Sequence, residues 1–332
     1  MGVFKPTQSE ILKALKENAG GFVSGESLAE RLGISRTGIW KHINKLKEMG
    51  YDILSHSRAG YKLVEIPDSL SHKEIVPNLK SRWLGASYHY LETVDSTNDY
   101  GLLLAAKGAP NGTVVVAEEQ KKGRGRLTRE WLSSPTRGIY MSLLLRNPLP
   151  VQVAPQSTYI GALALVKVLR EKFSLPSSIK WPNDVLIGAK KAVGILTEMQ
   201  SDQDYSRFIV MGIGINVNHS REELAGPFRY PATSIAIETG FTIKRQHLLI
   251  EFLYQFEKDY ELFLKGGLSA IIPQIEAHSG ILGKTVTLIC GDREVTGKAL
   301  GFTPEGALRL LKSDGSEETV WAGDVARVEG AV

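Results

Sequence analysis

A multidomain α+β fold is predicted for this chain by three observations. Its 332 residues exceed what one hydrophobic core normally organises. In the middle of the chain, helical and strand-like hydrophobic periods alternate, and several strand-like runs follow one another without a helix between them. Near the C-terminus, only short strand-like runs separated by turns remain. We therefore expect three domains, at residues 1–66, 71–267 and 280–330.

Composition places the chain among globular proteins, with 42% hydrophobic and 23% charged residues. No apolar run approaches the roughly 20 residues that a membrane span requires, and the N-terminus does not resemble a secretory signal. We therefore expect a cytoplasmic protein with no membrane partner. The single cysteine, Cys290, excludes an internal disulfide and a cysteine-based zinc cluster.

The first domain has the pattern of a winged helix-turn-helix. Helical periods at residues 7–16, 27–32 and 36–49 are interrupted by Leu-Gly-Ile-Ser before the third, where Ser35 can cap the helix. Two strand-like runs, 51–55 and 61–64, flank a polar turn and would form the wing. Residues 1–66 carry ten Lys or Arg and seven Asp or Glu, so most of the net charge of +4 lies here. This excess favours an acidic polymer as partner.

The third helix turns a polar face away from its apolar stripe. Arginine and lysine contact phosphates or guanine edges, and asparagine can read adenine. DNA binding is therefore expected from this face, whose candidate residues are Ser35, Arg36, Thr37, Trp40, Lys41, Asn44 and Lys45. The alternative is an ordinary solvated face or a surface for protein contacts.

The central domain is expected to be a mixed or antiparallel sheet with helices, because its strand-like runs are consecutive. The expected helices are 96–106, 155–173 and 244–264, and the expected strands are 113–118, 138–146, 179–187, 192–199 and 208–217. The C-terminal domain is expected to be a small SH3-like β-barrel, with strands at 285–290, 294–302, 308–311 and 318–321.

Four polar clusters in the central domain can carry chemistry. Asp95-Ser96-Thr97-Asn98 opens a helix, and as a plain N-cap it needs no other role. The stretch 123–131, Gly-Arg-Gly-Arg-Leu-Thr-Arg-Glu-Trp, places forked cationic donors in a glycine-rich loop, which indicates an anion site or an exposed basic loop. Lys-Trp-Pro-Asn-Asp at 180–184 precedes a hairpin that leads to two lysines, and Gly-Ile-Gly-Ile-Asn at 212–216 ends an apolar strand. Neither a phosphate-binding P-loop nor a complete dinucleotide fingerprint occurs.

Four motifs in this order resemble the biotin protein ligase family: Gly-Arg-Gly-Arg…Arg-Glu-Trp at 123–131, Lys-Trp-Pro-Asn-Asp at 180–184, Lys-x-x-Gly-Ile-Leu at 191–196 and Gly-x-Gly-Ile-Asn at 212–216. With the winged helix in front, the chain resembles the bifunctional members of this family, which are also biotin-operon repressors. The resemblance extends to Trp321-Ala322-Gly323 near the C-terminus. It implies that the protein joins biotin to ATP, giving biotinyl-5′-adenylate and pyrophosphate, and transfers biotin to a lysine of a carrier domain. Lipoate–protein ligases share the segment 180–184 and are the nearest alternative. A biotin-sensing repressor without catalysis is another.

The resemblance also assigns roles to residues. It implies catalytic roles for Lys191, Arg126 and Asp184. It implies biotin contacts by Ser96, Thr97, Asn98, Gln120, Arg124, Gly125, Arg126 and Lys191, and nucleotide contacts by Arg126, Arg129, Trp131, Lys191 and Asn216. Lys191 would neutralise the carboxylate and α-phosphate, whereas Lys190 would be solvated, and residues 219–234, with Gly226, Pro227 and Pro231, would order over the adenine. Leu127 and Thr128 depart from the family's usual arginine-rich loop.

Cofactor and partners follow from the same resemblance. ATP and biotin are the expected substrates, and Mg²⁺ is expected with ATP, although no carboxylate cluster marks a dedicated metal site. The expected partners are the biotin carrier domain of a carboxylase, operator DNA, and a second copy of the chain in a ligand-promoted homodimer.

Overall fold

The chain forms two compact units in a computed structural model, Met1–Asp68 and Ser69–Val332. The structure describes residues 6–18, 20–226 and 230–329. Pro227 and the outermost residues of the first and third expected domains lie outside these ranges. Among the described residues, no helix has the length and apolar character needed to cross a membrane.

The first unit has the predicted winged helix-turn-helix order. Its elements are α1 (Pro6–Glu17), α2 (Gly25–Leu32), α3 (Arg36–Glu48), β1 (Asp52–His56) and β2 (Gly60–Glu65). Ser35 caps α3 as expected, because its Oγ accepts a hydrogen bond from the Gly38 N–H at 3.1 Å. The apolar stripe of α3, formed by Ile39, Ile43 and Leu46, is fully buried against α1 and α2. The antiparallel pair β1–β2 is the wing.

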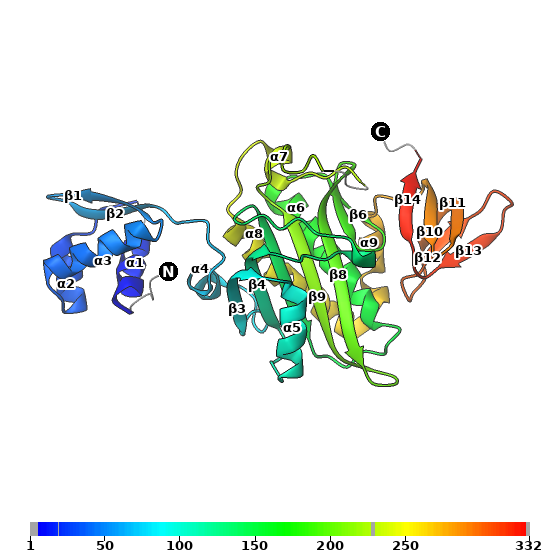
Figure 1. Ribbon diagram of the computed structural model, residues 1–332, viewed down its shortest axis with the longest axis horizontal. Coiled ribbons are helices and arrows are strands. Elements are labelled where there is room, and N and C mark those ends of the chain that lie inside the picture. The colour runs from blue at the N-terminus through cyan, green and yellow to red at the C-terminus, as the bar shows by residue number, and fades with distance from the viewer. Residues whose placement is uncertain (1–5, 19, 227–229, 330–332) are drawn as a thin grey trace. The chain divides into compact units, whose positions relative to one another are not determined.

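A seven-stranded mixed sheet is the centre of the second unit (Figure 1). Its strands run in the order β3-β4-β5-β9-β8-β7-β6, and only β3 and β4 are parallel. Their bounds are β3 (Tyr88–Val94), β4 (Thr113–Gln120), β5 (Gly138–Leu145), β6 (Ser177–Lys180), β7 (Asp184–Ile187), β8 (Lys190–Ser201) and β9 (Ser206–Asn216). The mixed α+β architecture expected from consecutive strands is confirmed. The edge strand β3 was not predicted.

One expected strand, 179–187, is wrong as a single element. The chain forms two antiparallel strands, β6 and β7, joined by a tight turn at Trp181, Pro182 and Asn183. The Trp181–Pro182 peptide bond is cis. Proline supplies no N–H to a strand ladder, so a strand cannot run unbroken through this segment. The turn places the polar residues of the motif at the end of the sheet instead of along it.

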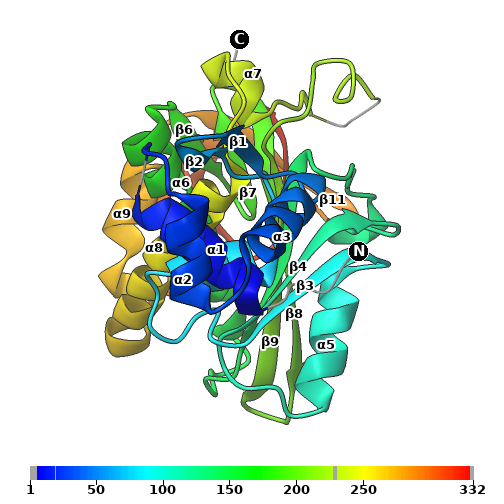
Figure 2. The ribbon, with the colours of Figure 1, turned by 90° about the vertical axis from the view of Figure 1, so that its left-hand side faces the viewer.

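Helices cover the two faces of the sheet unequally. Figure 2 shows the sheet between α8 (Arg245–Gly266) on one side and α5 (Thr97–Ala106) on the other. Strand β5 follows this division, because Leu143 and Leu145 belong to the large core with α6 (Ser157–Phe173) and α8, whereas Leu144 packs in a small cluster beside α5. The shorter helices are α4 (His72–Ile75), α7 (Ile235–Thr239), α9 (Ile272–Ala277) and the 3-10 turns Val76–Asn78, Arg126–Thr128, Ala154–Gln156 and Leu268–Ala270.

The C-terminal residues form a five-stranded antiparallel sheet in the order β13-β12-β11-β10-β14. Its strands are β10 (Thr285–Cys290), β11 (Arg293–Phe302), β12 (Leu308–Leu311), β13 (Glu317–Val320) and β14 (Asp324–Val328). The expected small β domain is confirmed, and β14 is a strand that the sequence did not predict. Both sheets belong to the second compact unit, so the division into 71–267 and 280–330 stays a prediction.

Candidate active site

A cavity of about 640 Å³ opens where the ends of several strands meet. Helix α5 begins beside it, β4 ends at Gln120 beside it, and the β6–β7 turn, β8 and β9 complete its wall. Every central-domain site residue expected from the sequence lines this one cavity: Ser96, Thr97, Asn98, Gln120, Arg124, Gly125, Arg126, Arg129, Trp131, Asp184, Lys191 and Asn216. The tertiary fold therefore brings together residues that are spread over 120 positions of the sequence, from 96 to 216.

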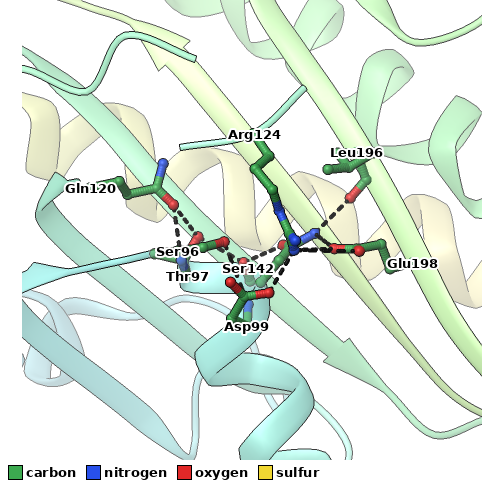
Figure 3. Close-up of polar contacts among 9 residues, drawn as sticks. Ser96, Thr97, Asp99, Gln120, Arg124, Ser142, Leu196 and Glu198 are labelled. Atoms are coloured by element: carbon green, nitrogen blue, oxygen red, sulfur yellow. Dashed lines mark hydrogen bonds and ion pairs between the residues drawn. The ribbon is translucent and has the colours of Figure 1, made fainter. Parts of the chain in front are cut away.

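Hydroxyl and amide groups form one end of the cavity. Thr97 donates its hydroxyl to Gln120 Oε1 at 3.0 Å, and its backbone N–H donates to the same oxygen at 2.9 Å. Ser142, from β5, lies 2.8 Å from the Thr97 hydroxyl and 2.6 Å from Asn98 Oδ1 (Figure 3). Thr97 and Asn98 are buried. The sequence motif at 95–98 is thus both an N-cap and part of a continuous polar network.

The arginine loop, residues 123–131, forms a second side of the cavity. It is closed on itself by hydrogen bonds from the Gly125 N–H to the Arg129 carbonyl and from the Trp131 N–H to the Gly123 carbonyl. The Arg124 side chain contacts two carboxylates that do not line the cavity. Its Nη2 lies 2.5 Å from Asp99 Oδ1 and 3.4 Å from Glu198. Its guanidinium is therefore already paired.

The other two arginines of the loop meet a residue from the C-terminal sheet. Arg129 donates to Asp324 Oδ2 at 2.6 Å, and Arg126 lies 3.3 Å from Asp324 Oδ1. Arg126 also donates to the carbonyl of Gly323 and to Asn183 Oδ1, each at 3.3 Å. Asp324 lines the cavity and was missed by the sequence analysis. No local signal marks it, because its partners are almost 200 residues away in the sequence.

Lys191 and Asp184 lie on the neighbouring strands β8 and β7, although the register partner of Lys191 is Leu186. Lys191 Nζ lies 2.7 Å from Asp184 Oδ1, at ion-pair distance but without hydrogen-bond geometry, and 5.4 Å from the centre of the Trp131 ring. Lys190, in contrast, pairs with Glu238 at 3.1 Å and does not line the cavity. The two neighbouring lysines therefore differ in environment, and Lys190, which was expected to be solvated, is half-buried and ion-paired.

Three glycines make room for side chains in the cavity wall. A Cβ on Gly214 would lie 2.3 Å from the Trp131 indole, and one on Gly194 would lie 2.7 Å from the same ring. A Cβ on Gly212 would lie 2.3 Å from Asn98 Oδ1. Real Cβ atoms do not approach other atoms so closely, so the glycine pattern 212–216 exists to seat these side chains, not to bind a dinucleotide. The Trp131 Nε1 is buried and has no hydrogen-bond partner among the described residues.

Residues 230–233 lie beside the Lys191 end of the cavity. The Lys191 N–H donates to the Pro231 carbonyl at 2.8 Å, and the Thr233 N–H donates back to the Lys191 carbonyl at 2.9 Å. Asn216 is buried and donates to the Thr233 carbonyl. Tyr230 and Lys180, which the sequence analysis did not assign, also line the cavity, with Lys180 Nζ 2.9 Å from the Tyr230 ring centre. Pro227 lies outside the described residues.

The first unit presents the expected polar face on α3. Ser35, Arg36, Thr37, Trp40, Lys41 and Lys45 are exposed, whereas Asn44 is half-buried. Trp40 is 55% exposed and lies on this polar face. Lys47 donates to Ser55 Oγ at 3.0 Å and ties the wing to this helix.

No group of three His, Cys, Asp or Glu side chains suited to a metal ion occurs within residues 6–18, 20–226 and 230–329. The cavity itself contributes separated acidic side chains, Glu130, Asp184 and Asp324, and the two aspartates are engaged with cations.

Comparison with known proteins gives three family matches. Residues 7–62 match an HTH domain, residues 90–216 match the Biotin/lipoate A/B protein ligase family, and residues 281–328 match the Biotin protein ligase C terminal domain. The "Bifunctional ligase/repressor BirA" of Bacillus subtilis is 36% identical over 318 residues, which are 96% of this chain and 98% of that protein. The protein of the same name from Escherichia coli is 32% identical over 307 residues, covering 92% and 93%.

A solved structure gives the same relationship. The biotin protein ligase of Aquifex aeolicus, in complex with biotin and ATP, is 31% identical, with a TM-score of 0.62. The match covers 72% of this chain and 97% of that one.

Proposed function

The chain belongs to the biotin protein ligase family, in its group of bifunctional ligases and repressors, and we propose that it activates biotin with ATP and transfers it to a lysine of a biotin carrier domain. One observation carries the proposal: the polar cluster, the arginine loop and Lys191 line a single cavity. Such a cavity can hold an uncharged polar ring at one end and anionic groups at the other.

The reaction has two steps. In the first, a carboxylate oxygen of biotin attacks the α-phosphorus of ATP, and pyrophosphate leaves with the bonding electron pair. In the second, the carrier lysine amine attacks the acyl carbon of the adenylate, AMP leaves, and the amine loses a proton. Both partners of the first step are anionic, so their approach requires positive charge fixed beside the reacting atoms.

Lys191 is proposed to provide that charge. Its amine lies in the cavity on a rigid strand, and Asp184 and the Trp131 ring limit where it can point. We propose that Arg126 and Arg129 assist it with forked donors once the loop closes on the nucleotide. Asp184 is proposed to accept the proton of the carrier lysine in the second step, since it is the carboxylate closest to Lys191.

Binding roles are proposed for the remaining lining residues. Hydroxyls and amides suit the ureido ring of biotin, which favours the network of Ser96, Thr97, Asn98 and Gln120 as its site. Gly125 permits a close approach of the loop backbone, and the buried Trp131 Nε1 and Asn216 lie toward the proposed nucleotide end. Arg124 is proposed to act through the position of the loop, because carboxylates already hold its guanidinium.

Mg²⁺ is proposed to arrive on the phosphates of ATP. Magnesium retains several waters and commonly binds through substrate phosphates with one or two carboxylates, so a dedicated protein cage is not needed. The separated carboxylates of the cavity agree with this arrangement.

The first test is mass spectrometry of a biotin carrier domain incubated with the protein, ATP and biotin, together with measured pyrophosphate release. Addition of one biotin and biotin-dependent pyrophosphate release are expected. Equal release with lipoate would favour the lipoate–protein ligase alternative, and the absence of release would favour a biotin sensor without catalysis. The C-terminal domain match and the bifunctional relatives both favour biotin.

A second function is proposed for the first unit, namely binding of operator DNA through α3 and the wing. Arg36, Lys41 and Lys45 are exposed on one helix and would displace phosphate counterions, so affinity should fall steeply with salt. Trp40 and Asn44 on the same helix are proposed to contact base edges.

Formation of the adenylate is proposed to promote a homodimer and thereby tighten operator binding. One winged helix makes few base contacts, and a dimer on a two-fold operator presents two. Sedimentation and operator binding should be measured without ligand, with biotin, and with biotin plus ATP. Dimer fraction and operator affinity are expected to rise together in the third condition. Identical values in all three conditions would refute the coupling.

A further inference from the structure

Two carboxylates lie just behind the cavity wall, Asp99 on α5 and Glu198 on β8. Neither lines the cavity. Both approach Arg124, but Glu198 has a second and shorter contact, because its Oε2 accepts a hydrogen bond from Asn98 Nδ2 at 2.6 Å. Figure 3 shows Glu198 on the far side of the polar network from Gln120.

The orientation of the Asn98 amide is determined by these contacts. Its Nδ2 donates to the Glu198 carboxylate and to the Leu196 carbonyl at 3.2 Å, both of which can only accept. Asn98 Oδ1 must therefore face Ser142, whose hydroxyl lies 2.6 Å away. The amide is buried, and Gly212 leaves it space that any larger residue would fill.

This orientation is transmitted to the cavity. The Thr97 hydroxyl donates its proton to Gln120 Oε1. In the contacts of Ser142 with Thr97 and Asn98 Oδ1, the Ser142 hydroxyl is therefore the donor, and its single proton is shared between these two oxygens. Gln120 then keeps its Nε2 group for Ser133 and the cavity. The direction of every donor from Asn98 to Gln120 thus follows from the two acceptors at Asn98 Nδ2, of which the Glu198 carboxylate makes the shorter contact and the Leu196 carbonyl the longer one.

We propose that Glu198 is a positioning residue for biotin: its carboxylate orients Asn98, and through Ser142 it orients the Thr97 and Gln120 groups that face the ring. The inference rests on the proposed function of the cavity. It does not depend on the charge of Glu198, because the contact with Asn98 requires only an acceptor. The 3.4 Å contact with Arg124 is secondary, since Asp99 holds the same guanidinium nitrogen at 2.5 Å.

Three variants of the full-length protein separate the two contacts of Glu198. Glu198→Ala removes both, Glu198→Gln keeps an acceptor for Asn98 without the charge, and Asp99→Ala removes the main partner of Arg124 but leaves Asn98 untouched. The measured quantities are kcat, the KM for biotin and the KM for ATP in pyrophosphate release, with the unfolding midpoint temperature of each variant.

Glu198→Ala is expected to raise the KM for biotin about three- to tenfold, the factor that corresponds to losing one ordinary hydrogen bond. Its KM for ATP should stay at the parent value, which a general structural defect would not allow. Glu198→Gln should restore the parent KM for biotin, and Asp99→Ala should retain it.

Two results would overturn the proposal. An unchanged KM for biotin in Glu198→Ala would show that the Leu196 carbonyl orients Asn98 without Glu198. An increase of the same size in Asp99→Ala and Glu198→Gln would show that the charge acts through Arg124. Failure of the proposed function would be distinct, because the parent protein would then release no pyrophosphate with biotin.

Discussion

At the scale of single residues, the proposed adenylation depends most on the positive charge of Lys191. Lys191→Ala should reduce the rate of adenylate formation about 10²–10³-fold, the usual cost of removing one donor to developing charge. Biotin-dependent pyrophosphate release measures this rate, and circular dichroism can verify that the fold is intact.

The matched control for this variant is Lys190→Ala. Lys190 adjoins Lys191 in β8 but pairs with Glu238 outside the cavity, so its loss should leave turnover nearly unchanged. Near-parent turnover in Lys191→Ala would remove Lys191 from the proposed mechanism.

His219 gives the second unit a pH-dependent stability. The pKa of its imidazole is lowered to about 4, mainly by burial, with Arg137 and Arg245 adding to the decrease and Glu223 opposing it. The unfolded chain, with a pKa near 6.5, therefore binds a proton that the folded protein excludes, so stability is present above about pH 6.5 and is lost as the pH falls toward 4. The loss over this window is on the order of 3 kcal/mol.

Urea unfolding at pH 7 and pH 5 measures this contribution. His219→Asn should lower the difference in unfolding free energy between the two pH values by about 2 kcal/mol relative to the parent. Equal pH dependence in parent and variant would show that His219 does not titrate in this range.

At the scale of elements, the arginine loop is held at both ends by carboxylates. Asp99 and Glu198 pair with Arg124 on one arm, and Asp324 pairs with Arg126 and Arg129 on the other. The loop is therefore ordered by residues from α5, β8 and β14, not by its own sequence.

Arg126→Gly should loosen this loop and release activated biotin. The change removes contacts to Asn183, Gly323 and Asp324 and adds a flexible residue, so closure over the adenylate becomes less favourable. Biotin should then label lysines of a bystander protein such as serum albumin, which western blotting with streptavidin detects.

Lys122→Ala is a suitable control for the loop variant, because this exposed side chain pairs with Asp95 and does not line the cavity. It should label the carrier domain alone. If Arg126→Gly also labels only the carrier and holds its adenylate as long as the parent, the loop does not retain the intermediate.

At the scale of the whole molecule, the two compact units have separate hydrophobic cores. Removal of residues 1–66 should eliminate operator binding and retain ligation, because, among the residues that the structure describes, those lining the cavity all lie at position 96 or later. Electrophoretic mobility shift and carrier biotinylation measure the two activities. A truncated protein that still shifts a specific operator fragment would contradict the assignment, whereas loss of ligation would show that the first unit supports the active site.

The sequence by itself indicated the helix order of the first unit, the main strands of the central sheet and twelve of the residues that line the cavity. Ser35 and Ser96 were recognisable because caps are local, and β4, β5, β8 and β9 were recognisable because apolar strands keep their pattern wherever they pack. The clusters at 95–98, 123–131, 180–184 and 212–216 could be singled out because each concentrates polar or glycine residues at a strand or helix end.

Only the tertiary structure decided how those clusters meet and what holds them. Asp324 and Glu198 have ordinary sequence surroundings, and they matter because folding places them against Arg126, Arg129 and Asn98. The glycines at 194, 212 and 214 likewise have a purpose only beside Trp131 and Asn98. Hydrogen bonds, ion pairs and close packing act between residues that are distant in sequence, so a local pattern cannot specify their partners, whereas caps and periodicity act within a few residues and can be read directly.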